Sequence, residues 1–168
     1  PNPNIANSRS SNIQHDEHDC LIVVDGSFQG TRSATDFKHA GIAFLIHVFS
    51  SRQTYIGGQF LPTTDGENSA PVAEAEATLN ALTFACSIHM KRPLIVHDNL
   101  DLTNFLSGTS SITKQSAGGR YSRLKERIKR VTSYFDTASC SHVNSHTNDR
   151  LRLIENDVVD KLAIFFRK

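Results

Sequence analysis

Residues 21–27 read LIVVDGS, an apolar run that ends at Asp25 and is followed by Gly26 and Ser27. Four successive apolar residues, three of them β-branched, predict a strand. A second, mostly apolar run at residues 94–97 ends in the same way at Asp98. Because open α/β sheets carry their chemistry beyond the strand ends, the two acids indicate a site there. Asp-Gly is also a common turn dipeptide, so a plain turn aspartate after an edge strand is the alternative for each acid taken singly.

The rest of the chain alternates strand and helix signals. We expect strands at 20–25, 41–49, 52–61, 94–98 and 137–143, and helices at 71–89, 100–106, 120–135 and from about 156. This order, β-β-β-α-β-α-α-β-α, predicts an α/β fold with a mixed five-stranded sheet: a three-stranded meander, then crossovers back to the sheet. Residues 1–19 are polar and are expected to form a disordered tail, which leaves residues 20–168 as one domain.

Composition restricts the class of protein. The 168 residues are 38% hydrophobic, which is typical of one soluble domain, and a net charge of +1 does not by itself announce a nucleic-acid partner. The three cysteines are odd in number and lack Cys-x-x-Cys spacing, so we expect neither a disulfide framework nor a zinc ribbon. No apolar run approaches a membrane span and no signal pattern opens the chain. We therefore expect an intracellular protein in a reducing compartment, with no membrane partner. The first residue is Pro, which suggests a processed product or a domain excised from a longer protein.

Helical phase separates two neighbouring glutamates in the predicted helix at 71–89. At about 100° per residue, Glu76 shares a face with polar side chains, and we expect that face to be solvated. Glu74 lies nearly opposite, on the alanine-rich side that must pack on the sheet. A carboxylate there is costly unless it is paired or bound to metal. Glu74 is therefore the candidate ligand, with a structural ion pair as the alternative.

The C-terminal segment offers two more acids, Asp157 and Asp160, three residues apart on a predicted helix. Asn156 is a good N-cap, and an acid directly after it is favoured by the helix dipole. That assigns Asp157 to the helix end and leaves Asp160 free. Together with Asp25, Glu74 and Asp98 it would make a set of carboxylates that could hold two hard divalent cations, which prefer oxygen ligands.

The predicted helix from Arg120 is basic on one side. Its arginines form a stripe beside an apolar stripe that would dock the helix, so they could face phosphates. The alternative is an ordinary solvated amphipathic face. Glu126 is the only acid three or four residues away, so pairing within the helix explains few of these charges. The stripe consists of Arg120, Arg123, Arg127 and Arg130.

These motifs resemble those of type 1 ribonuclease H domains, both cellular and retroelement-borne. Residues 24–27 are similar to the family's opening Asp-Gly-Ser, residues 73–77 to its glutamate helix, and residues 97–99 to its strand-end Asp-Ser motif. His146 and residues 155–163 resemble the histidine loop and the closing Asn-x-x-x-Asp-x-Leu-Ala. The resemblance covers about residues 20–168 with the motifs in order. It implies an RNase H-like fold and an endonuclease that cuts the RNA strand of RNA/DNA hybrids.

The resemblance also implies roles. Asp25 would bridge two Mg²⁺ ions, for which Mn²⁺ can substitute, with Glu74 and Asp98 on one side and Asp160 on the other. His146 would assist proton transfer or product release; without the resemblance it reads as an exposed loop histidine. Nucleic-acid contacts would come from Gly26, Ser27, Asn99, Arg123, Arg127 and Arg130. The partners implied are an RNA/DNA hybrid and, in a retroelement, a linked reverse transcriptase polymerase domain in the virion; a cellular member would lie in cytoplasm or nucleus.

The chain departs from the family pattern between residues 107 and 119, a Gly/Ser/Thr-rich linker with one charge, where many members carry a basic handle helix. The segment before Glu74 also lacks the usual Thr-Asn-Asn. Two other functions stay open: a non-cleaving nucleic-acid-binding module, and another nuclease of the superfamily. Four retained acids argue against the module, because carboxylates repel phosphates. Ser27 argues against a proofreading exonuclease, which has Asp-x-Glu here.

Overall fold

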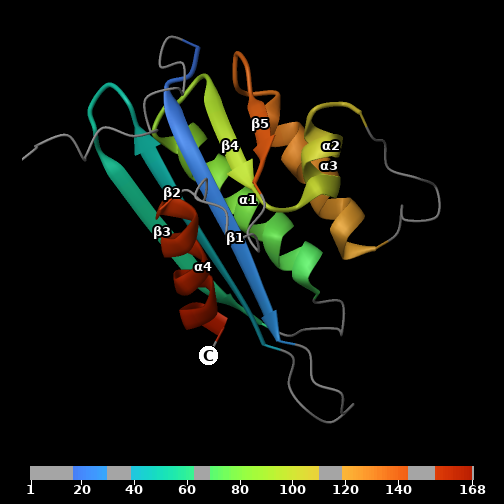
Figure 1. The fold of residues 1–168 in the computed structure, drawn as a ribbon. Helices are drawn as coiled ribbons and strands as arrows, with labels where there is room; N and C mark the ends of the chain where they lie inside the picture. Colours follow the sequence, from blue (N-terminus) through green and yellow to red (C-terminus); the bar gives the residue numbers. More distant parts are fainter. Residues whose placement is uncertain (1–16, 30–38, 63–68, 110–118, 144–153, 168) are drawn as a thin grey trace, which may run out of the picture.

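The computed structural model describes residues 17–29, 39–62, 69–109, 119–143 and 154–167. These residues form strands and helices in the predicted order, which confirms the mixed α/β fold (Figure 1). The elements are β1 (Cys20–Gln29), β2 (His39–Val48), β3 (Thr54–Leu61), α1 (Ala70–Ser87), β4 (Pro93–His97), α2 (Leu100–Leu106), α3 (Arg120–Thr132), β5 (Ser139–His142) and α4 (Ile154–Arg167).

The five strands lie in the order β3-β2-β1-β4-β5. The first three form the predicted antiparallel meander, and β4 and β5 then add in parallel. Several boundaries differ by one to three residues, and the largest difference is in β1. This strand does not end at Asp25 but continues to Gln29, because the first half of β2 supplies backbone partners, Ala43 for Asp25 and His39 for Gln29. Since β1 is the central strand, Asp25 is not a turn residue after an edge strand.

Helices cover both faces of the sheet: among the described residues, α4 lies on one face and α1 packs against the other (Figure 1). The central strand shows why. Alternate side chains of a strand point to opposite faces, and Cys20, Ile22 and Val24 join the core on the α1 side, whereas Leu21 and Val23 join the core under α4. Burial on both faces explains the continuous apolar run that opens the domain.

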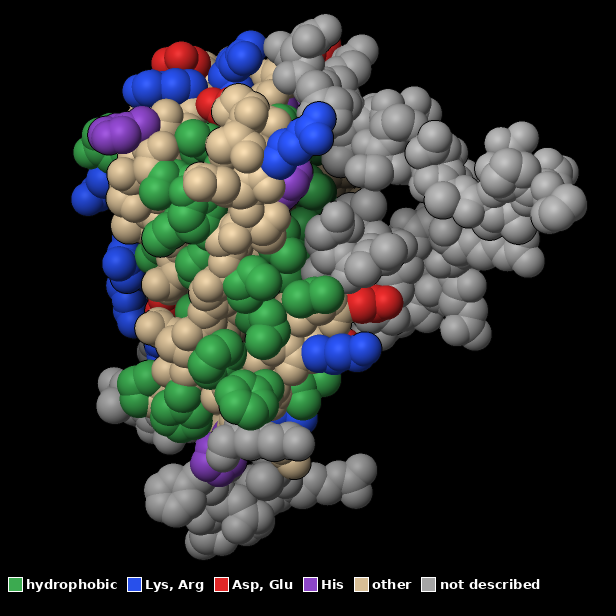
Figure 2. Space-filling model, turned by 90° about the vertical axis from the view of Figure 1, so that its left-hand side faces the viewer, with side chains coloured by type: hydrophobic (Ala, Val, Ile, Leu, Met, Phe, Trp, Pro, Cys, Tyr) green, Lys and Arg blue, Asp and Glu red, His purple; other side chains and the backbone are tan. Residues whose placement is uncertain are grey.

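The edge strand β3 presents an apolar face. Figure 2 views the molecule from this side, and hydrophobic side chains gather on the surface it shows. Ile56 and Phe60 of β3 are 57% and 45% exposed, and the strand TYIGGQFL contains no Lys or Arg. Since phosphate contacts depend on basic side chains, β3 is a poor surface for nucleic acid.

Most of the predicted tail, residues 1–16, lies outside the described residues. Its last residue belongs to the fold, because the Asp19 carboxylate accepts hydrogen bonds from the backbone N–H groups of Lys91 at 2.6 Å and Arg92 at 3.0 Å. All three cysteines, Cys20, Cys86 and Cys140, are free. Among the described residues, no helix combines the length and apolarity needed to cross a membrane.

Candidate active site

The parallel register of β1 and β4 brings two of the predicted acids level. The strands pair from Cys20 and Pro93 up to Val23 and Val96. Asp25 and Asp98 each lie two residues beyond that last pair, so they emerge side by side where β4 ends and β1 continues. This is the carboxyl end of the parallel strands, where such sheets carry their chemistry.

Gly26 brings the glutamate of α1 to the same place. A Cβ atom on Gly26 would lie 2.3 Å from the backbone nitrogen of Glu74 and 2.4 Å from the carbonyl carbon of Ala73. No side chain fits there, so the first turn of α1 packs directly on the backbone of β1. The missing side chain of Gly26 therefore admits α1 and places Glu74 beside Asp25; contact of Gly26 with nucleic acid stays a prediction.

Helix α4 supplies the fourth acid. The Asp160 carboxyl forms a hydrogen bond with Asp25 and adds its charge to that site. The capping argument that singled out Asp160 was wrong, however. α4 begins at Ile154, so Asn156 is not an N-cap but a buried residue of the first helical turn, 5% exposed. The choice of Asp160 rests on its position next to Asp25.

Burial and neighbouring acids raise the pKa values of Asp25 and Glu74. Burial, followed by the charges of Asp98 and Asp160, raises the pKa of Asp25 to about 7, against a hydrogen bond from the Gly26 backbone that lowers it. Burial and the charge of Asp98 likewise raise the pKa of Glu74 to about 7, although a side-chain hydrogen bond from Asn99 lowers it. Shifts of this kind, from desolvation plus like charges, mark candidate functional sites.

Asp98 is held by its neighbours yet leaves one oxygen unsatisfied. Its backbone oxygen lies 2.9 Å from Nε2 of His142 on β5. Its Oδ1 atom is buried and has no hydrogen-bond partner among the residues that the structure describes. Buried carboxylate oxygens are normally satisfied, so this atom can accept a cation. Even so, within the described ranges no three Asp, Glu, His or Cys side chains already form a group that could hold a metal ion.

His97, directly before Asp98, is buried and stabilises the backbone next to Asp98. It is 1% exposed, and burial lowers its pKa to about 4, so its ring is neutral at neutral pH. Nδ1 accepts a hydrogen bond from the backbone N–H of Asn99 at 3.2 Å, and Nε2 lies 3.2 Å from Sγ of Cys140 on β5. The neutral ring therefore fixes the backbone on both sides of Asp98.

Two predicted nucleic-acid contacts are engaged within the fold. Asn99 is the N-cap of α2, where its Oδ1 accepts a hydrogen bond from the Leu102 backbone N–H at 2.9 Å. The Ser27 hydroxyl accepts a hydrogen bond from Nη1 of Arg167 at 2.9 Å. Contacts of these residues with nucleic acid stay predictions. His146 lies outside the described residues.

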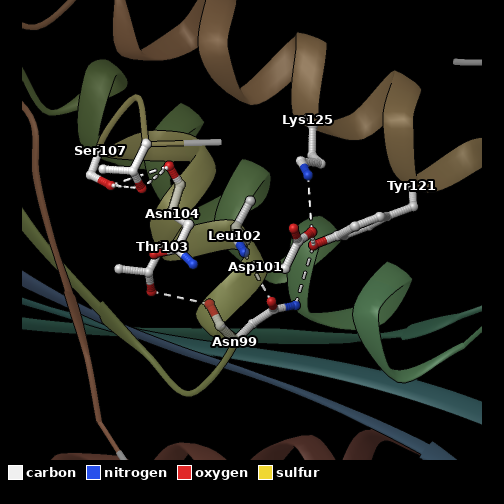
Figure 3. A network of polar contacts seen from close by, with 9 residues as sticks. Asn99, Asp101, Leu102, Thr103, Asn104, Ser107, Tyr121 and Lys125 are labelled. Atoms are coloured by element: carbon white, nitrogen blue, oxygen red, sulfur yellow. Dashed lines mark hydrogen bonds and ion pairs between the residues drawn. The ribbon is translucent and has the colours of Figure 1, made fainter. Parts of the chain in front are cut away.

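A polar network beside Asn99 was not predicted. Tyr121 and Lys125, four residues apart on α3, both donate hydrogen bonds to Oδ2 of Asp101, each at 2.9 Å (Figure 3). The Asn99 amide donates to the Tyr121 hydroxyl at 3.4 Å. The i, i+4 spacing of Tyr121 and Lys125 was a usable signal, but Lys125 lies outside the arginine stripe that drew attention to this helix.

The basic face of α3 is only partly as expected. Arg123, Arg127 and Arg130 are exposed. Arg120 instead forms an ion pair with Glu76 of α1, with Nη2 and Oε1 3.0 Å apart. The face of α1 that we expected to be solvated at Glu76 therefore contacts α3, and the Glu76 side chain is only 15% exposed. The docking stripe is confirmed at Leu124 and Ile128, which are buried.

Comparison with solved structures agrees with this architecture, whereas no protein-family model and no curated protein matches the chain. Among solved structures, RNase H1 from the halophilic archaeon Halobacterium salinarum NRC-1 is similar at a TM-score of 0.67 and 18% identity, over 88% of this chain and 96% of that one. LC11-RNase H1 in complex with an RNA/DNA hybrid gives a TM-score of 0.67 at 14% identity over the same shares.

The RNase H-like fold also occurs in a larger protein that resembles this chain. The protease-reverse transcriptase of prototype foamy virus matches at a TM-score of 0.68 and 18% identity, over 96% of this chain but 22% of that one. At such identities the likeness establishes the fold alone, and the chain has an RNase H-like fold.

Proposed function

We propose that this protein is a metal-dependent endoribonuclease that hydrolyses the RNA strand of RNA/DNA hybrids by a two-metal mechanism. One observation carries the proposal: acids from β1, α1, the end of β4 and α4 gather at one point, where burial and then their neighbours' charges raise the pKa values of Asp25 and Glu74. A purely structural site gains nothing from such repulsion, whereas divalent cations would offset it.

The donor set fits Mg²⁺, which binds carboxylate oxygens and retains several waters. Asp25, Glu74, Asp98 and Asp160 would hold the ions, and the unsatisfied Oδ1 of Asp98 is an open ligand atom. When bound, two such ions activate a water and stabilise the leaving oxygen of an in-line displacement. The products would be a 5′-phosphate and a 3′-hydroxyl.

The protein's own residues would contribute orientation and proton transfer. His97 and His142 fix the backbone around Asp98, and Gly26 holds α1 against β1. We assign proton transfer near the leaving group, or help in product release, to His146. Exposed Arg127 and Arg130 on α3 would contact phosphates, and 2′-hydroxyl contacts would distinguish RNA from DNA.

We also propose that this chain is linked to a reverse transcriptase polymerase domain. Its likeness to part of a foamy virus protease-reverse transcriptase supports this linkage. The sequence encoded upstream of Pro1 would test it. Polymerase motifs there would support the linkage, and their absence would leave a free ribonuclease H.

The activity is tested by incubating the protein with a labelled RNA/DNA hybrid, duplex RNA and duplex DNA, in Mg²⁺ and then in chelator. We expect cleavage of the hybrid alone, dependent on metal and reduced at least 100-fold in Asp98→Asn, because the variant removes a ligand charge. Asp136→Asn, at an exposed acid outside the site, is the matched control and should retain activity. Hybrid binding without cleavage in Mg²⁺ or Mn²⁺ would favour the non-cleaving module.

A further inference from the structure

A continuous polar chain runs from the interior of α3 to the candidate metal site. Nζ of Lys125 donates to Asp101 Oδ2, the Tyr121 hydroxyl donates to the same oxygen, and the Asn99 amide donates to the Tyr121 hydroxyl (Figure 3). Asn99 also forms a side-chain hydrogen bond with Glu74. Three elements, α3, α2 and α1, are thus joined at one carboxylate of the acid cluster.

In this series of polar contacts, the protonation states of the side chains determine which group donates each hydrogen bond. Asp101 is an acceptor held ionised, because hydrogen bonds from Lys125 and Tyr121 lower its pKa. Burial and the Asp101 charge raise the pKa of Tyr121, so the phenol keeps the proton that it donates. The Tyr121 oxygen must then accept a hydrogen bond from the amide nitrogen of Asn99. The amide oxygen of Asn99, Oδ1, already accepts a hydrogen bond from the Leu102 backbone N–H. The amide NH₂ group is therefore the end that faces Glu74.

Packing fixes the far end of the chain. Lys125 is 6% exposed although it carries a charge, and its Nζ lies 4.8 Å from the ring centroid of Phe105 and 5.1 Å from that of Tyr121. These are cation–π distances. A buried ammonium held by two rings and a carboxylate has little freedom to move. Asp101, the residue that it orients, has a side chain 57% exposed and would otherwise be mobile.

We propose that Tyr121 and Lys125 of α3 are positioning residues, which act through Asp101 and Asn99 to hold the Glu74 carboxylate in place for a divalent cation. The inference rests on the proposed metal site. It assigns α3 a second role besides phosphate contact, because the interior face of the helix orients a ligand while its exposed face carries arginines. Residues that hold a metal ligand in place without binding the metal themselves fix the ligand's orientation and affect metal affinity.

The test is Mn²⁺ binding by the full chain without nucleic acid, measured from the loss of the free Mn²⁺ electron paramagnetic resonance signal. Tyr121→Phe removes one hydroxyl and keeps the ring under Lys125; Lys125→Met keeps the apolar stem and leaves Asp101 to water. Each should raise the Mn²⁺ Kd about threefold to tenfold, less than the roughly 10–100-fold typical of a direct neighbour of a ligand. The matched controls Tyr134→Phe, at a 69% exposed ring, and Lys129→Met, on the exposed face of α3, should not change it.

A purely structural role would have a different signature. It would lower the unfolding temperature in chelator but leave the Mn²⁺ Kd of the folded protein unchanged, which would overturn the inference while the proposed function stands. Failure of the unchanged protein to bind Mn²⁺ would overturn both. In cleavage assays the same variants should need about threefold to tenfold more Mg²⁺ for half-maximal rate, with the rate at saturating Mg²⁺ close to that of the unchanged protein.

Discussion

Replacing Asp25 by Asn should stabilise the metal-free protein at alkaline pH. The pKa of Asp25 is raised from 3.8 to about 7 by burial and by the charges of Asp98 and Asp160. A shift of about three units corresponds to roughly 4 kcal/mol at about 1.4 kcal/mol per unit. That figure is an upper bound on the cost of ionising Asp25 in the folded state, because partial exposure and relaxation of the site reduce it. Asn keeps the shape of the side chain and removes the charge.

The sign follows from proton linkage. An acid whose pKa is higher in the folded than in the unfolded state binds more protons when folded, so the free energy of unfolding falls as pH rises between about 4 and 7. At pH 5, about one unit above the unfolded pKa, part of this loss has already occurred, so the variant should be more stable than the unchanged protein by at most about 1.6 kcal/mol. At pH 8 it should be more stable by about 1–4 kcal/mol, or roughly 3–12 °C in Tm for a protein of this size.

Thermal or urea unfolding in chelator at pH 5 and pH 8 measures this difference, and Asp136→Asn controls for loss of a charge elsewhere. Adding Mg²⁺ should reduce or reverse the difference in stability between the variant and the unchanged protein. Cation binding stabilises the unchanged protein, whereas the variant lacks a ligand. An Asp25→Asn variant that is no more stable than the unchanged protein at pH 8 in chelator would refute the repulsion argument, and with it the main support for a cation site.

Two further predictions concern the scaffold and the basic helix. Gly26→Ala should lower the free energy of unfolding in urea by about 3 kcal/mol or more, because its Cβ would lie 2.3 Å from the Glu74 backbone nitrogen. The control Gly119→Ala, with no atom within 4 Å of the new Cβ, should lower it by only about a few tenths of a kcal/mol. Equal losses in the two variants would contradict the close packing of α1 on β1. Replacing Arg127 and Arg130 together by Ala should weaken hybrid binding and reduce the salt slope of log K by about 1–2, with stability changed by less than about 1 kcal/mol; an unchanged slope would place the phosphates elsewhere.

The order of elements could be predicted because each carries a strong local signal. The run at residues 21–24 is buried on both faces and the helices have amphipathic or alanine-rich patterns, so local sequence decided them. The end of β1 could not be predicted in this way. Asp25 and Gly26 are poor strand residues, and only pairing with β2 keeps them extended. A tertiary partner overrode the local preference.

The same limit applies to the site. Helical phase identified Glu74 correctly as the residue facing the sheet, since that geometry is local. It assigned Glu76 to solvent wrongly, because the ion pair with Arg120 depends on α3, 44 residues further along the chain. The cap at Asn156 failed for a similar reason: the residue is buried in the first turn of α4, and burial cannot be read from a three-residue capping pattern.

The arrangement of the acids is better explained by a ligand than by folding. Gly26 is needed to bring α1 against β1, and the result places Glu74 near like charges, which destabilises the folded protein without a cation. Natural proteins sacrifice local stability mainly at functional sites. Asn99 offsets part of the repulsion through its hydrogen bond to Glu74, and the ammonium of Lys125 pairs with Asp101. The compensation within the described residues is therefore partial, and a divalent cation would supply the charge that the protein itself does not place there.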